Sequence, residues 1–496
     1  MRESGILLPI SSLPSQYGIG CFSKEAYEFV DQLALANQKY WQILPLGPTS
    51  YGDSPYQSFS TYAGNPYFID LNTLIEEGVL TKKECNLADF GSDSRFIDYG
   101  KLYKARYKLL RKAYERSNIS QNPEFQTFQE ENAWWLDDYS LFMAVKGFFQ
   151  DECWDKWPED IKKRYGYALD YYREQLYFEV EFQKYMQFEF SIQWKKLKTY
   201  ANENGIRIIG DIPIYVAYDS ADTWAHPELF QLDEENVPLA VAGCPPDGFA
   251  ADGQLWGNPL YRWDYHRQTG YAWWMQRLSY AFYLYDVVRI DHFRGFDEYF
   301  SIPYGDTTAR NGHWEKGPGI ELFRRMKEVL GERDVIAEDL GYVTDSVRQM
   351  VFESGFPGMK VFEFAFDSRD TGCAGDYLPH NYPVNSVVYT GTHDNATLIG
   401  WYQDIPKEGR EMLRDYIHDY ITSDRSLHWS VICRVMGSPA RICMIPMQDY
   451  LGLDNTCRIN TPSTLGTNWK WRLLDGEFTS DLQNKIKKLV RIYQRN

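Results

Sequence analysis

The sequence has few basic residues relative to acidic ones, and this shortage limits the partners that it can bind. Lys and Arg number 52 against 69 Asp and Glu, so the formal net charge at pH 7 is −17. Nucleic acids and anionic membranes require a cationic protein surface that neutralises phosphate. We therefore expect no nucleic-acid partner and no membrane partner, and a neutral ligand fits this composition better.

Motifs of several common enzyme classes are also missing. No GxSxG sequence follows an apolar run, and neither GxGxxG nor GxxxxGK[ST] occurs, so a serine hydrolase and a nucleotide-binding enzyme are both disfavoured. The eight cysteines form no CxxC pair, which favours reduced, packed thiols over disulfides or zinc ligands. The eight histidines lack paired metal-ligand spacing, so we expect no catalytic metal and no cofactor.

Targeting signals are absent as well. The start MRESGILLPI lacks the basic, apolar, small-residue order of a secretory signal, and no uncharged apolar run reaches the roughly 20 residues that span a bilayer. We therefore expect a cytoplasmic protein. Aromatic residues, by contrast, make up 17% of the chain. Flat rings with a polar edge suit stacking on sugars, but they suit a large core equally well.

Short apolar runs that end in polar or glycine-rich loops recur along the chain. Runs of this kind are typical of strands buried on both faces of a parallel sheet. Helix-period segments separate several of them, for example residues 319–334, where apolar residues recur every three or four positions before Gly331. We predict an α/β fold, a (β/α)8 TIM barrel without a C-terminal β-sandwich, with strands within the runs 5–10, 40–46, 206–216, 286–291, 334–339, 359–364, 386–391 and 441–447.

Uneven spacing between the runs indicates insertions in the barrel. About 160 residues separate the second run from the third, far more than one crossover helix needs, and residues 99–117 and about 172–200 have helical patterns. We predict one catalytic barrel over 1–496, with a mostly helical subdomain at 75–200 between strands 2 and 3. Residues 217–285, rich in Gly, Pro and Trp, are predicted to form lid and substrate-binding loops between strands 3 and 4.

Two neighbouring runs end in carboxylates. Strand side chains alternate, so Arg289 and Asp291 face the same way, and the cation would keep Asp291 ionised as a nucleophile. Glu338 ends the next run, and adjacent strands bring such groups toward the roughly 5 to 5.5 Å separation of retaining glycosidases. Glu338 would then be the acid/base, with its pKa raised by burial and negative charge. The alternatives are a structural ion pair at Arg289-Asp291 and a helix start at Glu338-Asp339.

A third carboxylate, Asp394, follows His393 at the end of the seventh run. A fixed anion there could stabilise an oxocarbenium-like transition state, which carries positive charge. A lone His-Asp pair would more often be structural. The convergence of three strand ends on one mouth of the barrel favours the catalytic interpretation.

The loops at these strand ends resemble the signature loops of the 4-α-glucanotransferase (amylomaltase, disproportionating enzyme) family, glycoside hydrolase family 77 of the α-amylase clan. The three loops are RIDHFRGF (289–296), IAEDLG (336–341) and GTHDN (391–395). The resemblance extends over almost the whole chain, through residues 52–71, 210–224, 245–261 and 458–472. It implies transfer of an α-1,4-glucan segment to the 4-OH of an acceptor by a retaining double displacement through a covalent glycosyl-aspartate. Maltooligosaccharides and starch- or glycogen-derived α-1,4-glucans are the expected partners.

The resemblance also assigns roles to residues. It implies Asp291 as nucleophile, Glu338 as general acid/base and Asp394 as transition-state stabiliser. Arg289 and His393 are implied to position the donor sugar. The full set of implied substrate-binding residues is Ser54, Tyr56, Asp211, Phe249, Trp256, Arg289, His393 and Asn460. For Tyr56 and Trp256, packing under a loop is the alternative. Tyr99 resembles a second glucan contact of some relatives.

Two further segments are compared with the family. Residues 245–261 resemble its flexible lid, and glycines there permit movement that would exclude water and favour sugar as acceptor. Near the end, Pro462-Ser463-Thr464 and Thr467-Asn468-Trp469 stand where the family usually has Pro-Gly-Thr and Gly-Asn-Trp. Because Ser takes a positive φ less easily than Gly, we expect a modest local difference in that loop and around Asn460.

Three other functions are compatible with some of these sequence features. A hydrolase would use the same carboxylates with water as acceptor, and a catalytically silent glucan-binding protein would keep the barrel and the aromatic residues. The complete carboxylate set argues against the silent protein. A transferase part of a debranching system is disfavoured because no second catalytic domain is recognised in the sequence. The sequence leaves open the preferred donor, the minimum acceptor, the size of any cyclic product and the oligomeric state.

Overall fold

A closed barrel of eight parallel strands forms the centre of the molecule. The structure is a computed structural model that describes residues 2–50, 52–246, 251–341, 343–366 and 374–496. Each strand overlaps one of the eight apolar runs, so the predicted (β/α)8 barrel is confirmed. In the order around the barrel the strands are β1 (Glu3–Leu7), β2 (Tyr40–Gln42), β3 (Arg207–Ile212), β6 (Val287–Ile290), β9 (Val335–Ala337), β10 (Gly358–Val361), β11 (Ser386–Tyr389) and β12 (Ile442–Pro446).

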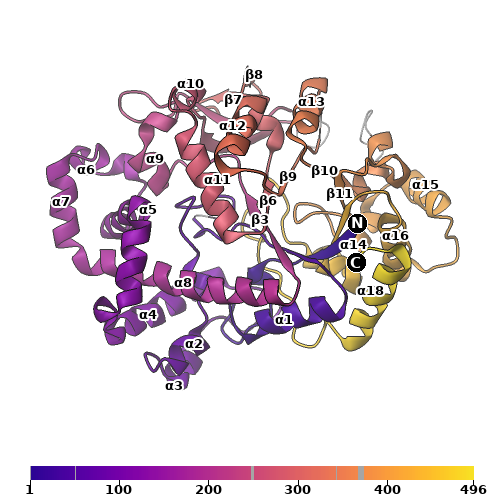
Figure 1. Cartoon of the computed structure of the whole chain (residues 1–496), viewed down its shortest axis with the longest axis horizontal. Coiled ribbons are helices and arrows are strands. Elements are labelled where there is room, and N and C mark those ends of the chain that lie inside the picture. The colour runs from indigo at the N-terminus through magenta and orange to yellow at the C-terminus, as the bar shows by residue number, and fades with distance from the viewer. Residues whose placement is uncertain (1, 51, 247–250, 342, 367–373) are drawn as a thin grey trace.

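Burial on both faces explains why these strands have nearly continuous apolar sequences. Every residue of β6, β11 and β12 is buried, because side chains fill the barrel interior on one face and helices cover the other. The predicted helix before Gly331 is present, and Gly331 follows its last residue with a φ of 75°. The helices that surround the barrel in Figure 1 include α1 (Lys24–Leu35), α11 (Ala272–Leu284), α12 (Ile320–Leu330), α13 (Asp345–Ser354), α14 (Leu398–Asp404), α15 (Lys407–Ile417), α16 (Leu427–Met436) and α18 (Ser480–Tyr493).

Helices dominate the chain between β2 and β3. The predicted helix at 99–117 is present with the same bounds, whereas the one expected from about Tyr172 begins at Tyr177, because α7 ends before it at Gln175. Part of this region packs around a second hydrophobic core that includes Trp154, Trp157 and Trp224. The helices are α2 (Leu71–Glu76), α3 (Lys82–Leu87), α4 (Tyr99–Ser117), α5 (Pro123–Phe148), α6 (Glu159–Lys162), α7 (Gly166–Gln175) and α8 (Tyr177–Glu203).

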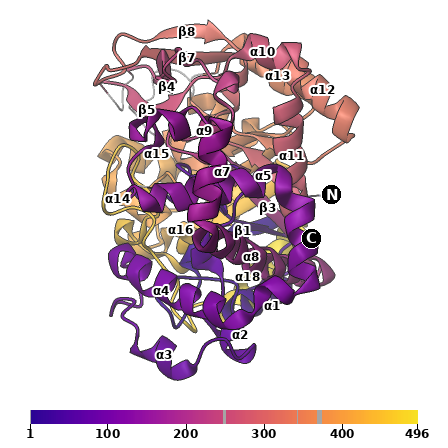
Figure 2. The ribbon, with the colours of Figure 1, turned by 90° about the vertical axis from the view of Figure 1, so that its left-hand side faces the viewer.

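A small antiparallel sheet stands beside the barrel, with the strand order β5, β4, β7, β8. Its strands are β4 (Ala240–Cys244), β5 (Gln254–Pro259), β7 (Glu298–Pro303) and β8 (His313–Lys316). Figure 2 shows them together near α10 (Trp263–Gln268) and α9 (Ala221–Ala225). This sheet was not among the predicted elements, because β4 and β5 precede β6 in the chain and β7 and β8 follow it, so no local pattern indicates their pairing.

The two ends of the chain meet at the barrel. Arg2 donates a hydrogen bond to the carbonyl of Tyr493, and the buried Arg495 donates to the carbonyls of Met436 and Ala440. Figure 1 shows the two termini close to each other, near the end of α18. In the described ranges no helix combines the length and the apolarity that a membrane span requires.

Candidate active site

Strand register brings the predicted residues to one end of the barrel. Asp211 of β3 and Arg289 of β6 are direct register partners. Ile290 pairs with Ala337 of β9, so Asp291 and Glu338, each one residue further along, follow neighbouring positions on adjacent strands. Because all eight strands are parallel, the loop after β11 that carries Asp394 emerges at the same end.

Arg289 connects two carboxylates. Its Nη1 lies 2.6 Å from Oδ2 of Asp211, and its Nη2 lies 3.0 Å from Oδ1 of Asp291. The predicted common orientation of Arg289 and Asp291 is therefore observed. The Arg289 and Asp211 side chains are buried, whereas that of Asp291 is 27% exposed. Asp291 is thus the carboxylate of this trio that a ligand can reach.

Asp211 is also tied to an aromatic residue. The hydroxyl of Tyr56 donates to Asp211 Oδ2 at 2.7 Å, while Asp211 Oδ1 is buried and has no hydrogen-bond partner among the described residues. Burial raises the pKa of Asp211, and the Arg289 charge lowers it in opposition. Asp211 therefore holds Tyr56 and Arg289 through Oδ2, while Oδ1 is a buried acceptor.

Glu338 is held by two backbone amides. The N–H of His292 donates to Oε2 at 2.7 Å and the N–H of Leu340 donates to Oε1 at 3.0 Å. His292 lies in the left-handed region with a φ of 51°, in the turn that directly follows Asp291. Burial, followed by the negative charge of Asp291, raises the pKa of Glu338 to about 8, although Arg289 lowers it. Glu338 is therefore protonated at neutral pH next to an accessible carboxylate.

Asp394 has the opposite electrostatic environment. Burial alone would raise its pKa, but His393 and the hydrogen bond from Asn460 lower it below the ordinary value. His393 Nε2 lies 3.3 Å from Asp394 Oδ2, and Asn460 Nδ2 donates to Oδ1 at 2.6 Å. The guanidinium of Arg458 donates to the backbone carbonyls of Asp394 and Asn460, which joins the two loops. Asp394 is consequently a fixed anion.

Aromatic rings form a wall beside these groups. Tyr56 stacks on His393 with ring centroids 5.2 Å apart and an interplanar angle of 11°. Trp469 contacts both rings, at 5.9 Å from Tyr56 and 6.1 Å from His393. Trp469 was not among the predicted site residues, because its ring reaches the site through a loop from the far end of the chain.

Trp256 reaches the site from the small sheet. Its ring meets that of His292 edge to face, with centroids 4.9 Å apart, and its Nε1 donates to Gln254 at 3.1 Å. Trp256 is half-buried. The residue thus lies next to the turn that links Asp291 with Glu338, which no local sequence pattern could show.

The remaining predicted residues occupy different places. Ser54 accepts a hydrogen bond from the backbone N–H of Tyr56 at 3.2 Å, so it shapes the loop that carries this tyrosine. Phe249 lies outside the described residues. Tyr99 begins α4 with its hydroxyl donating to the carbonyl of Trp469 at 2.8 Å, and it is 8% exposed, so its ring offers a sugar little free surface.

The loop around Pro462-Ser463-Thr464, where a modest difference from the family is expected, contains a residue with a left-handed backbone conformation. Ser463 has a φ of 64°, so it adopts the strained conformation that Gly would take more easily. The side chain of Asn468 holds the loop closed, accepting from the N–H of Thr461 at 3.0 Å and donating to the carbonyl of Thr464 at 2.9 Å. Asn460 reaches Asp394 although Ser463 stands where the family usually has Gly.

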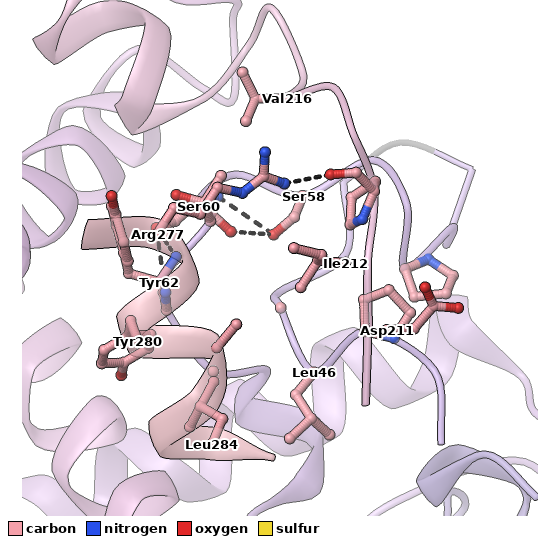
Figure 3. Close-up of a pocket in the computed structure, with 18 of the residues that line it drawn as sticks. Leu46, Ser58, Ser60, Tyr62, Asp211, Ile212, Val216, Arg277, Tyr280 and Leu284 are labelled. Atoms are coloured by element: carbon pink, nitrogen blue, oxygen red, sulfur yellow. Dashed lines mark hydrogen bonds between the residues drawn. The ribbon is translucent and has the colours of Figure 1, made fainter. Parts of the chain in front are cut away.

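A narrow cavity lies behind this cluster, between β3, the loop 45–64 and α11 (Figure 3). Tyr56 and Asp211 border one side, and Tyr280 and Leu284 border another. In Figure 3 the Asp211 carboxylate points away from Arg277 and Tyr280. None of the three catalytic candidates lines this space, so the cavity lies outside the carboxylate cluster itself.

A closed parallel barrel with carboxylates gathered at the carboxyl ends of its strands is the architecture of a TIM-barrel enzyme. The sequence model of the 4-alpha-glucanotransferase family, glycoside hydrolase family 77, matches residues 8–477. The 4-alpha-glucanotransferase of Clostridium butyricum is 50% identical over 98% of this chain and 99% of its own, and that of Thermus thermophilus is 45% identical over 100% and 99%.

A solved structure gives the same result in three dimensions. The amylomaltase from Streptococcus agalactiae in complex with acarbose superposes with a TM-score of 0.96 at 40% identity, covering 100% of both chains. The chain therefore belongs to the 4-alpha-glucanotransferase family, and it is a 4-alpha-glucanotransferase, an enzyme of the transferase class. The predicted family is confirmed.

Proposed function

We propose that this enzyme transfers α-1,4-glucan segments by a retaining double displacement in which Asp291 and Glu338 act as a pair. The observation that carries the proposal is the contrast between these two neighbours. Asp291 is paired with the Arg289 guanidinium at 3.0 Å, whereas Glu338 has a pKa of about 8 and holds a proton at neutral pH. A nucleophile must be ionised and a general acid must be protonated, and this environment favours both states at once.

In the first step the Asp291 carboxylate attacks the anomeric carbon of the donor glucan. The glycosidic C–O bond breaks as the new C–O bond forms, and Glu338 gives its proton to the departing oxygen, which leaves with the reducing-end part of the donor. In the second step Glu338 takes the proton of the acceptor 4-OH as that oxygen attacks the anomeric carbon. The bond to Asp291 breaks, both carboxyl groups regain their initial states, and the two inversions retain the α configuration.

The other predicted residues would bind and orient the sugar. Asp394 remains an anion beside His393, so it can hold sugar hydroxyls and stabilise the positive charge of an oxocarbenium-like transition state. Asp211 would serve the donor site by holding Tyr56 and Arg289 in place. We propose the predicted set as the glucan path, namely Ser54, Tyr56, Asp211, Phe249, Trp256, Arg289, His393 and Asn460.

Transfer rather than hydrolysis requires that sugar reaches the covalent intermediate before water does. We propose that residues 245–261, within the insertion 217–285, cover bound glucan. We also propose that residues 75–200 form an inserted subdomain. Support comes from Trp256, which contacts His292 next to Asp291. The substrates proposed are maltooligosaccharides and starch- or glycogen-derived α-1,4-glucans, consistent with the acarbose complex of the S. agalactiae amylomaltase.

Incubation with maltotriose tests the transfer step. A transferase should release glucose and build a ladder of longer maltooligosaccharides while the number of reducing ends stays nearly constant. Steady growth of reducing ends would instead identify a hydrolase. The covalent step is tested by trapping with a fluorinated glucosyl fluoride and locating the label by peptide mass spectrometry. A label on Asp291 is expected, and an unlabelled Asp291 would contradict the nucleophile assignment.

A further inference from the structure

Three aromatic rings from α5 and α11 form a continuous row outside the carboxylate cluster. Trp134 of α5 contacts Tyr280 of α11 with centroids 6.0 Å apart, and Tyr280 contacts Tyr283 at 5.8 Å. Trp134 is 40% exposed and Tyr283 is 56% exposed. Neighbouring exposed rings of this size mark interaction surfaces more often than isolated apolar residues do.

Tyr280 and Tyr283 of this row line a groove between α5, α8 and α11, and Trp134 contacts Tyr280 beside it. Two buried tryptophans lie at its base, Trp135 from α5 and Trp194 from α8, and the Trp194 indole donates to the carbonyl of Leu284 at 3.1 Å. Figure 1 shows these three helices on the side of the molecule away from α15. Since helix packing and the indole bond fix the base, the groove is preformed rather than created by a ligand.

The polar groups of the groove indicate what kind of ligand it fits. Ser191, Lys195 and Thr199 line it, and within the described part of the chain their side chains, like the hydroxyls of Tyr280 and Tyr283, make no hydrogen bond. A purely apolar partner would leave these groups unsatisfied, which costs free energy. A ligand rich in hydroxyl groups with flat apolar faces would satisfy both the polar groups and the rings.

Charge argues further for a neutral ligand. The Lys198 ammonium in the groove is engaged by the carbonyl of Tyr283 at 2.9 Å and by Asp286 at 3.7 Å. Lys195 is therefore the groove lysine without an internal partner in the described residues. One exposed cation without an arginine fork is a weak basis for binding phosphate.

We propose that this groove is an auxiliary binding site for an α-1,4-glucan chain, which rests on the proposed function of the enzyme. The groove and the cavity behind Asp211 share Phe190, Tyr280 and Leu284, so α11 stands between the groove and the active-site side of the wall. A short oligosaccharide occupies the active site alone. A long polymer held in the groove raises the local concentration of glucan chains near the enzyme.

Binding is measured first, on an Asp291→Asn background that prevents turnover. Calorimetric titration with maltoheptaose is expected to lose one binding event per chain when Trp134→Ala and Tyr283→Ala are added. The matched control is Tyr420→Ala, a tyrosine 60% exposed that follows α15 in the chain and does not line the groove, which should leave the stoichiometry unchanged. An unchanged stoichiometry in the Trp134→Ala/Tyr283→Ala protein overturns the proposal.

Steady-state kinetics of variants that retain Asp291 distinguish the effects of the groove from those of the active site. In the Trp134→Ala/Tyr283→Ala variant the KM for amylose should rise about fivefold or more, with kcat and maltotriose disproportionation unchanged. If Trp134→Ala lowers the melting temperature, the single Tyr283→Ser variant replaces it.

Should the variants change only the oligomeric state and not glucan binding, the groove is a protein interface and the proposal is wrong. Absence of maltotriose transfer in the wild type would contradict the proposed function, while the binding titration still reports on the groove.

Discussion

Asp211 and Arg289 are register partners on adjacent barrel strands, and their side chains form a buried ion pair at 2.6 Å. The same guanidinium reaches Asp291 with its other terminal nitrogen. Asp211 therefore fixes the position of Arg289, and Arg289 in turn fixes the charge beside Asp291. A planar group with two donor ends is suited to such a bridge, which Lys could not make in the same geometry.

Removal of Asp211 should be costly for stability. Asp211→Ala leaves the buried Arg289 charge with only the partly exposed Asp291, so we expect a loss of about 3 to 5 kcal/mol in the free energy of unfolding, measured in urea. Tyr56→Phe is the matched comparison, because it removes only the 2.7 Å hydrogen bond to Asp211. That change should cost about 1 kcal/mol. Equal effects of the two substitutions would contradict the role of Asp211 in holding Arg289.

Replacement of the proposed nucleophile should separate activity from folding. Asp291→Asn keeps the size of the side chain but removes the attacking charge, so we expect maltotriose disproportionation to fall by about three orders of magnitude or more. Circular dichroism and thermal unfolding should show a folded protein. Asp297→Asn, in the same loop and bonded to Ser346 rather than to the site, should retain activity.

The raised pKa of Glu338 predicts the alkaline limb of the pH profile. Because the carboxyl must be protonated to act as an acid, kcat/KM for maltotriose should be high below pH 8 and fall as the pH rises through about 8. Glu338→Gln should lose most of the activity. The pH profile of the residual activity should lack the alkaline limb. A limb near pH 8 that survives in Glu338→Gln would assign it to another group.

The raised pKa of Glu338 also makes the stability of the folded protein depend on pH. A carboxyl whose pKa is 4.5 in the unfolded chain and about 8 in the folded one binds its proton more tightly when folded, so its contribution declines as the pH rises from about 4.5 to 8. Glu338→Gln removes this dependence. We expect the variant to melt above the wild type at pH 9 and by a smaller margin at pH 4.5. A margin that does not grow with pH would argue against a proton held by Glu338.

Asn460 should act through Asp394. Asn460→Ala removes a charge-assisted hydrogen bond to the carboxylate, and such a bond contributes about 1.5 to 3 kcal/mol. We expect kcat/KM to fall by about 10- to 100-fold, and the acidic limb of the pH profile to move to higher pH because the pKa of Asp394 rises. Thr464→Ala, which alters the same loop away from Asp394, is the control. An acidic limb that stays in place would show that Asn460 does not influence Asp394.

Local pattern was enough to predict part of the site. The common orientation of Arg289 and Asp291 follows from strand alternation, and the strand ends follow from where each apolar run meets polar residues. Trp256 and Trp469 could not be placed in this way. Trp256 belongs to a sheet whose strands pair across β6, and Trp469 comes from a loop far along the chain. Their positions depend on pairings between distant segments.

The sequence by itself therefore determined the eight strands, the barrel and the carboxylates at the strand ends, because burial and alternation act over a few neighbouring residues. Only the tertiary structure decided the protonation of those carboxylates. The proton on Glu338 depends on burial and on Asp291, and the charge on Asp394 depends on His393 and on Asn460, which is 66 positions away in the chain. A pKa is set by neighbours in space, and the barrel supplies those neighbours.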